Sequence, residues 1–179
     1  MDHANRIDAS NGKRFRKDAI DKELANVVVA FEILDEGKPA PVCWTKASGN
    51  IVFDAKMNFT RKAKWVKDCH RTTYPEHSIF AGVVSRESVR IEITYDALNG
   101  LYVTEADIKN AYLQDTSSET QYVICCAEFG LENIGKVAII RRALYGGKSR
   151  GADFLKHLRS CITYLGFTSC KDDPAIWMR

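Results

Sequence analysis

The pattern most suggestive of chemistry in this sequence is an aspartate followed by a tight turn. Residues 101–108 form an apolar run that predicts a short strand ending at Asp107, and residues 110–113 are predicted to turn into a helix. A carboxylate at a strand end can hold a metal-bound phosphate, while the N–H groups of Asn110 and Ala111 can donate to phosphate oxygens. The same spacing also fits an aspartate that only caps a helix, so both interpretations stay open.

Basic residues gather in three clusters, although the chain as a whole is only mildly basic. Its 26 lysines and arginines against 23 aspartates and glutamates give a net charge of +3, which is too small to indicate a polyanionic partner. The clusters are Lys13, Arg14, Arg16 and Lys17; Arg61, Lys62, Lys64 and Lys67; and Arg141, Arg142, Lys148 and Arg150. Each cluster fits either a solvated face or a surface that binds phosphate.

The cysteines show no pairing framework. None of the six forms a C-x-x-C pair, which favours reduced thiols in a cytosolic or nuclear protein. Cys69, His70 and His77 could supply part of a zinc site, but such a site needs four ligands and the fourth is missing. The N-terminus lacks an apolar signal region, and no run of ~18 uncharged apolar residues occurs. We therefore expect an intracellular chain, cytoplasmic or nuclear, without a membrane-spanning segment.

The elements that must position the middle basic cluster are a helix and a hairpin. In residues 16–31, apolar side chains recur every three or four positions, which predicts an amphipathic helix. Residues 50–57 and 62–69 are predicted to pair as the two strands of a hairpin. Lys62 and Lys64 would then lie near the hairpin tip.

Two sequence rules disagree over residues 88–96. Polar and apolar residues alternate strictly there, as in a half-buried strand. Ser85 is nevertheless a good helix N-cap, and Asn99 with Gly100 is a common helix end. The segment is a strand by its pattern and a helix by its caps, and alternation is the stronger of the two rules.

The last third of the chain mixes strands with a helix. Residues 121–127 and 136–142 are rich in β-forming residues and predict two strands. Apolar residues from 152 to 165 follow a helical period that closes at Gly166, and a final strand is predicted near Ile176. This order predicts an α+β fold with a mixed sheet, packed helices and one protruding lobe.

Four segments, in order, resemble motifs of copia-type retrotransposon reverse transcriptases. Residues 106–113, Ala-Asp-Ile-Lys-Asn-Ala-Tyr-Leu, resemble the first polymerase motif of that family, roughly D-V-K-T-A-F-L. Residues 53–66 resemble its fingers hairpin with a K-A-R-L-V core, and residues 143–148 resemble its A-L-Y-G-L-K segment. Residues 165–167 and 173–174 resemble its L-G-F and D-P. The likeness covers nearly the whole chain.

The resemblance implies a reverse-transcriptase-like fold with fingers and an incomplete palm. Residues 1–15 would be a polar lead-in and residues 16–179 a partial domain, divided into an N-terminal helix with the fingers hairpin (16–84) and a partial palm (85–179). The chain would then be a fragment of a retrotransposon polyprotein. Its implied partners are an RNA or DNA template–primer, deoxynucleoside triphosphates, and the remaining palm and RNase H region of the polyprotein, with no membrane partner.

The resemblance also implies a mechanism, nucleotidyl transfer assisted by two Mg²⁺ ions. Asp107 would be the catalytic residue and a ligand of both metals, because hard cations on carboxylates stabilise charge that spreads over phosphoryl oxygens. Tyr112 would press against the sugar and select deoxynucleotides. The implied nucleotide-binding residues are Lys62, Lys64, Asn110, Ala111, Tyr112, Tyr145, Gly146 and Lys148.

Several positions depart from the family pattern. Lys64 stands where the family has arginine, Cys69 where it has glycine, and residues 149–151, Ser-Arg-Gly, where it has Q-S-P. The family's second motif, an aromatic residue with two aspartates, does not occur before Arg179. One carboxylate rarely holds two metals, so we expect that this chain alone does not polymerise. The alternative is a non-catalytic nucleic-acid-binding remnant that uses the basic hairpin.

Overall fold

Four short strands from distant parts of the sequence form one mixed sheet in the computed structural model, which describes residues 2–68, 74–75 and 78–179. The strands are β1 (Phe31–Ile33), β2 (Thr45–Lys46), β5 (Gln121–Ile124) and β6 (Val137–Ile140). Their order is β1-β6-β5-β2, with β6 antiparallel to both neighbours and β2 parallel to β5. The predicted mixed sheet is confirmed, and it draws strands from both sides of residue 85.

A second sheet is the predicted hairpin. β3 (Gly49–Ala55) pairs antiparallel with β4 (Arg61–Lys67), in a register that runs from Gly49 opposite Lys67 to Ala55 opposite Arg61. Gly49 is required, because a Cβ at this position would lie 2.2 Å from the Trp65 ring. The hairpin is confirmed over these residues, whereas the strand end predicted at residue 69 lies outside the described residues.

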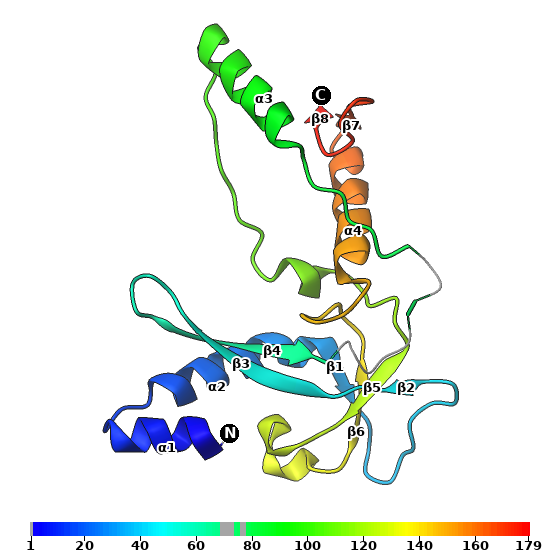
Figure 1. The fold of residues 1–179 in the computed structure, drawn as a ribbon. Helices are drawn as coiled ribbons and strands as arrows, with labels where there is room; N and C mark the ends of the chain where they lie inside the picture. The colour runs from blue at the N-terminus through cyan, green and yellow to red at the C-terminus, as the bar shows by residue number, and fades with distance from the viewer. Residues whose placement is uncertain (1, 69–73, 76–77) are drawn as a thin grey trace.

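One hydrophobic core joins the mixed sheet to the hairpin and to helix α2 (Phe15–Val27). Phe31 packs edge-on against Trp65 and Phe129, with ring centroids 5.2 and 4.9 Å apart. α2 lies along β4, and the Glu23 carboxylate accepts a 3.0 Å hydrogen bond from Trp65 N–H (Figure 1). α2 thereby covers the edge of β4 that does not pair with β3. The buried core residues are Val27, Ala30, Phe31, Ala47, Trp65, Val123, Cys125, Ala138, Ile140 and Leu144.

The polar N-terminus is helical, which differs from the loose lead-in that its composition suggests. Helix α1 (Asp2–Ser10) ends in a turn with Gly12 at a φ of 60°. Asp8 is only 8% exposed, and its Oδ2 accepts hydrogen bonds of 2.9 and 3.0 Å from the N–H groups of Arg16 and Lys17. First-turn N–H groups have no acceptor within their own helix, so Asp8 caps α2 from the preceding helix.

Helix α2 ends four residues earlier than the spacing of its apolar residues predicts. A 3-10 turn, η1 (Val28–Ala30), follows it, and Phe31 begins β1 instead of closing the helix. The reason is tertiary, because Phe31 is buried in the core and pairs with Ile140 of β6. Sheet pairing therefore overrides the helical period at this point.

The segment over which two sequence rules disagree is helix α3 (Arg86–Asn99), so the caps were right and the alternation was misleading. Ser85 Oγ accepts a 3.0 Å hydrogen bond from Ser88 N–H, and Gly100 takes a left-handed φ of 64°. No residue of α3 is buried, and Ile91 and Ile93 are among its exposed apolar side chains. The alternation of polar and apolar residues in this segment therefore does not correspond to a buried face of a sheet.

α3 and helix α4 (Arg150–Tyr164) form an arm that extends away from the mixed sheet (Figure 1). The small pair β7 (Thr168–Ser169) and β8 (Trp177–Met178) lies at the end of α4, beside the start of α3. Asp173 ties this end to the start of α3, accepting 2.9 and 2.7 Å hydrogen bonds from Ser85 N–H and Ser88 Oγ–H. These hydrogen bonds lower the pKa of Asp173 below its ordinary value, and the bond from Ser85 N–H has the largest effect. None of the helices in the described ranges is both long and apolar enough to cross a bilayer. The predicted C-terminal helix and final strand are confirmed.

Residues 101–108 have no regular secondary structure, so the predicted strand ending at Asp107 is wrong. A strand needs a hydrogen-bonded neighbour, and within the described residues no strand pairs with this segment. The segment leads to the 3-10 helix η3 (Ala111–Gln114), which matches the predicted turn into a helix. Two further 3-10 turns, η4 (Ala127–Phe129) and η5 (Leu131–Asn133), join β5 to β6.

The contact between α1 and α2 predicts a specific stability loss. Asp8→Ala removes the acceptor of two first-turn N–H groups and should lower the free energy of unfolding by about 0.5–2 kcal/mol, the usual range for a lost cap. Urea unfolding followed by circular dichroism measures it. Asp21→Ala, on the exposed face of the same helix, is the matched control, and equal midpoints for the two variants would contradict the capping role.

Candidate phosphate-binding site

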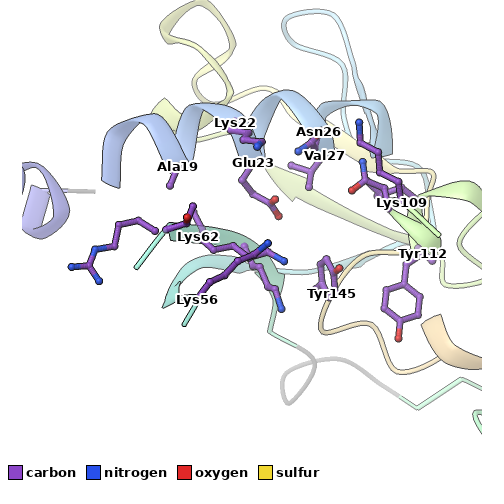
Figure 2. Close-up of a pocket in the computed structure, with 17 residues that line it drawn as sticks. Ala19, Lys22, Glu23, Asn26, Val27, Lys56, Lys62, Lys109, Tyr112 and Tyr145 are labelled. Carbon is purple, nitrogen blue, oxygen red and sulfur yellow. The ribbon is translucent and has the colours of Figure 1, made fainter. Parts of the chain in front are cut away.

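Two hollows share one wall, formed by the side chains of Lys62, Lys109, Asn110, Tyr112 and Tyr145. The first, which we call the cationic groove, lies between helix α2, the tip of the β3–β4 hairpin and the turn at residues 109–113 (Figure 2). Its volume is about 270 Å³. The second, which we call the aspartate hollow, adds Asp107, Ile108, Ala111 and Phe154 to the shared wall.

The cationic groove carries a strong local excess of positive charge. Six basic side chains line it, namely Lys22, Lys56, Arg61, Lys62, Lys64 and Lys109. Within the part of the chain that the structure describes, none of the six forms an ion pair with a carboxylate. The one acidic side chain of the groove is Glu23, and it already accepts the Trp65 N–H. A cleft lined by one sign of charge concentrates ions of the opposite sign.

Aromatic rings form the part of the wall nearest helix α4. Tyr112 meets Tyr145 and Phe154 edge-on, with centroids 5.5 and 5.9 Å apart. Cations lie over both tyrosines, Lys64 Nζ at 5.2 Å from the Tyr145 ring and the Arg150 guanidinium at 5.5 Å from the Tyr112 ring. These contacts hold the rings in place, and Arg150 adds one positive charge to the six of the groove.

The electrostatics of Tyr145 reflect this mixed environment. Burial is the largest cause that raises the pKa of its phenol above the ordinary value, followed by the negative charge of Glu23. The Asp107 carboxylate adds to the same effect, which places its charge within reach of Tyr145. The phenol therefore keeps its proton at neutral pH and can donate a hydrogen bond.

Asp107 and the turn after it lie where a bound group could reach them. Asp107 is exposed and lines its hollow together with Lys62 of the hairpin. Asn110 adopts a left-handed φ of 52°, and its carbonyl accepts a 2.9 Å hydrogen bond from Leu113 N–H as η3 begins. η3 has only four residues, so its dipole adds little to the attraction of an anion. The lysines, not the short helix, supply the positive field.

The residues around Asp107 do not by themselves make a magnesium centre. In the described residues, no group of three or more His, Cys, Asp and Glu side chains is arranged to hold a metal ion. Asp107 is the one carboxylate that lines its hollow. Two Mg²⁺ ions need a larger set of oxygen ligands, so the residues present do not fit a two-metal centre. The zinc ligands considered from the sequence, Cys69, His70 and His77, lie outside the described residues.

Most of the site residues expected from the sequence meet here, and two do not. Lys62, Asp107, Asn110, Ala111, Tyr112 and Tyr145 line the aspartate hollow, and Lys64 lines the cationic groove. Gly146 and Lys148 line neither of these two hollows. Lys148 Nζ lies 3.8 Å from the centroid of the Tyr74 ring, and the close approach that Gly146 permits is to the backbone of Lys67.

Sequence reasoning missed several residues of the two hollows. Lys22 reads as part of the solvated face of α2, and Phe154 as one member of a helical apolar stripe. Lys109 lies inside the first polymerase motif, but nothing local says that it faces the hairpin. Only the packing of α2 and α4 against the turn brings these side chains to the site, and no motif encodes that packing.

Comparison with known proteins gives partial matches. The chain is 25% identical over 115 residues to the Transposon Ty1-DR4 and Ty1-NL2 Gag-Pol polyproteins of Saccharomyces cerevisiae, which is 63% of this chain. It spans only 7% and 6% of the length of these curated relatives. No protein-family model matches, and no solved structure matches. The chain is thus similar to a short part of a retrotransposon Gag-Pol polyprotein, in agreement with the resemblance of its motifs at this coarse level.

The contact of Gly146 with β4 predicts a difference between two glycines of similar conformation. Gly135 and Gly146 have φ values of 83° and 86°, but a Cβ on Gly146 would lie 2.0 Å from the Lys67 carbonyl oxygen, whereas one on Gly135 meets nothing within 4 Å. Gly135→Ala should cost about 1–2 kcal/mol for the left-handed conformation. Gly146→Ala should cost roughly 1–3 kcal/mol more, for overpacking. Equal unfolding free energies for both variants would contradict this account.

Proposed function

We propose that this chain is a fragment of the reverse transcriptase region of a copia-type retrotransposon polyprotein, and that its two hollows bind the phosphates of a deoxynucleotide. The observation that supports the nucleotide site is the meeting of three segments far apart in the sequence. These are the hairpin with Lys62 and Lys64, the turn after Asp107, and Tyr145. The similarity to the Ty1 Gag-Pol polyproteins supports the polyprotein origin.

The cationic groove suits a short polyphosphate. Its cations repel one another in the folded chain, and a bound phosphate chain would relieve that repulsion. Its volume of about 270 Å³ lies just below the ~300–1,000 Å³ of common small-molecule pockets, which favours a compact anion over a duplex. Tyr112 and Tyr145 add ring faces against which a sugar or base can pack.

Asp107 is the residue to which we assign metal binding. When bound, Mg²⁺ would stabilise negative charge on phosphoryl oxygens. Because one carboxylate does not fit two metals, a two-metal centre would need carboxylates besides the one that the described residues place in this hollow. We therefore propose that the chain alone binds nucleotide but does not transfer it, and that its partners are the template–primer and the remainder of the polyprotein palm.

A second candidate function is a non-catalytic nucleic-acid-binding remnant. The observation that favours it is the charge of the cationic groove, which six basic side chains line, whereas the aspartate hollow is lined by two of these, Lys62 and Lys109, and by the Asp107 carboxylate. Cations alone bind phosphate backbones, with an affinity that falls steeply as salt rises. The two candidates differ in ligand, since the remnant would bind oligonucleotides and ignore the free deoxynucleotide.

The nucleotide proposal predicts a loss of binding in a defined variant. Lys62→Ala/Lys64→Ala removes two phosphate contacts, so the Kd of a fluorescent deoxynucleoside triphosphate should rise at least about tenfold, or 1.4 kcal/mol. The dependence of log K on log salt should become shallower by roughly one for each lysine that contacts phosphate. Fluorescence anisotropy between low and physiological salt measures both quantities.

Two controls sharpen that measurement. Lys156→Ala/Lys171→Ala removes the same charge from exposed positions on the arm and should change the Kd little. Asp107→Asn should abolish any effect of Mg²⁺ while leaving metal-free binding intact. Binding that is insensitive to Lys62 and Lys64 would sink the nucleotide proposal, and Mg²⁺-dependent primer extension by the chain alone would contradict its inactivity.

A further inference from the structure

A buried ion pair lies behind the candidate site. The side chains of Lys67 and Glu119 are only 2% and 5% exposed, and Lys67 Nζ lies 2.6 Å from Glu119 Oε2. Lys67 Nζ also donates to the side-chain carbonyl of Gln121. Neither Lys67 nor Glu119 lines the cationic groove or the aspartate hollow. The pair is thus a separate feature, which the proposed chemistry of the site does not use.

The second oxygen of the Glu119 carboxylate extends the pair into a network. Glu119 Oε1 accepts hydrogen bonds of 2.9 Å from both Ser149 N–H and Ser149 Oγ. The Ser149 hydroxyl is also 2.7 Å from Asp153 Oδ2, so its single proton can go to either carboxylate. Ser118 Oγ donates to the same Asp153 oxygen at 2.9 Å. Every polar atom of the ion pair is therefore tied to a named partner.

The network joins the segments that carry the site. Lys67 is the last residue of β4, the strand that bears Lys62 and Lys64. Gln121 is the first residue of β5, Glu119 lies two residues before it, and Ser149 is the residue before α4. The backbone belongs to the same junction, because Lys67 N–H donates to the Tyr145 carbonyl at 2.7 Å. One buried pair therefore connects the hairpin, the sheet, the loop of Tyr145 and the helix of Phe154.

The energetics favour a single arrangement of these segments. Burial of two charges costs several kcal/mol per ion unless geometry and hydrogen bonds are nearly complete. A displaced loop would take the two Ser149 donors away from the buried Glu119 carboxylate. Burial by itself raises the pKa of Glu119, but hydrogen bonds from Lys67 and Ser149 outweigh it, and the net shift is downward. Lys67 and the loop residue Ser149 thus both stabilise the charged form of the carboxylate.

We infer that Lys67 and Glu119 are positioning residues, which set the distance between the lysine-bearing hairpin and the loop that presents Tyr145. This inference rests on the proposed nucleotide site. An ion pair that only adds stability could be replaced by neutral groups of similar shape with no effect on binding. If the pair sets the width of the site, its replacement by neutral groups should weaken binding. The reason is that a loop shifted by even a small distance no longer lies opposite the hairpin lysines.

The test is the double variant Lys67→Met/Glu119→Gln in the 179-residue chain. It removes both charges but keeps similar volumes and an oxygen that accepts from Ser149, so the fold should survive. We expect hydrogen exchange in residues 143–149 to accelerate, and the Kd of the fluorescent deoxynucleoside triphosphate to rise, each at least about tenfold. The matched control is Arg141→Met/Glu32→Gln, which removes an ion pair whose side chains are 51% and 52% exposed and should change neither quantity.

Each outcome either supports or overturns the positioning role of Lys67 and Glu119. Unchanged exchange in residues 143–149 overturns the inference, as does faster exchange with unchanged nucleotide affinity. If the wild-type chain binds no nucleotide but exchange is still faster in the double variant, the proposed function is refuted. The coupling between hairpin and loop is then supported. If the double variant fails to fold, Ser149→Ala is the second test. It removes the hydroxyl contacts with Glu119 and Asp153, keeps the Ser149 N–H bond to Glu119, and should shift exchange and affinity in the same direction by a smaller factor.

Discussion

The close contact between the end of β4 and the loop at residues 145–147 is the constraint on which the candidate site depends. Lys67 N–H bonds to the Tyr145 carbonyl, and only a glycine fits at position 146 against the Lys67 carbonyl. This contact fixes the hairpin opposite the Tyr145 ring, where Lys64 lies over its face. The buried pair of Lys67 and Glu119 reinforces it from behind. The site is therefore a product of long-range contacts, and no single motif contains it.

Charge is distributed unequally over this framework, which the net charge of +3 conceals. Six cations converge on the groove, whereas the neighbouring hollow combines two of them, Lys62 and Lys109, with the Asp107 carboxylate. Under the proposed function, a phosphate would enter the groove without further help, but beside Asp107 it would meet a like charge unless a cation lay between them. The two proposed functions follow from this difference, because the groove serves either of them and the aspartate serves only the nucleotidyl transfer. If the proposal holds, the groove and a single carboxylate in the described part of the hollow would allow nucleotide binding without transfer.

The sequence correctly predicted those helices and strands whose formation depends on neighbouring residues in the chain. The hairpin follows from two strand-like runs, and α3 is set by Ser85 and Gly100 at its ends, despite a misleading alternation. The strand expected at residues 101–108 failed because strands depend on partners, and the described residues offer none there. The motif resemblance singled out Asp107, Tyr112 and Tyr145. It gave no sign of the ion pair, since its members lie 52 residues apart and match no motif.

The most direct test of the central claim is an NMR titration of the ¹⁵N-labelled chain with a deoxynucleoside triphosphate. The amide chemical shifts are measured at each ligand concentration. A nucleotide held between the hairpin and the turn should shift the amides of residues 61–64, 109–113 and 145 together, and they should saturate with one affinity. The amides of the N-terminal basic cluster, Lys13 to Lys17, should keep their chemical shifts. Shifts confined to that cluster, or none at residues 109–113, would contradict the account.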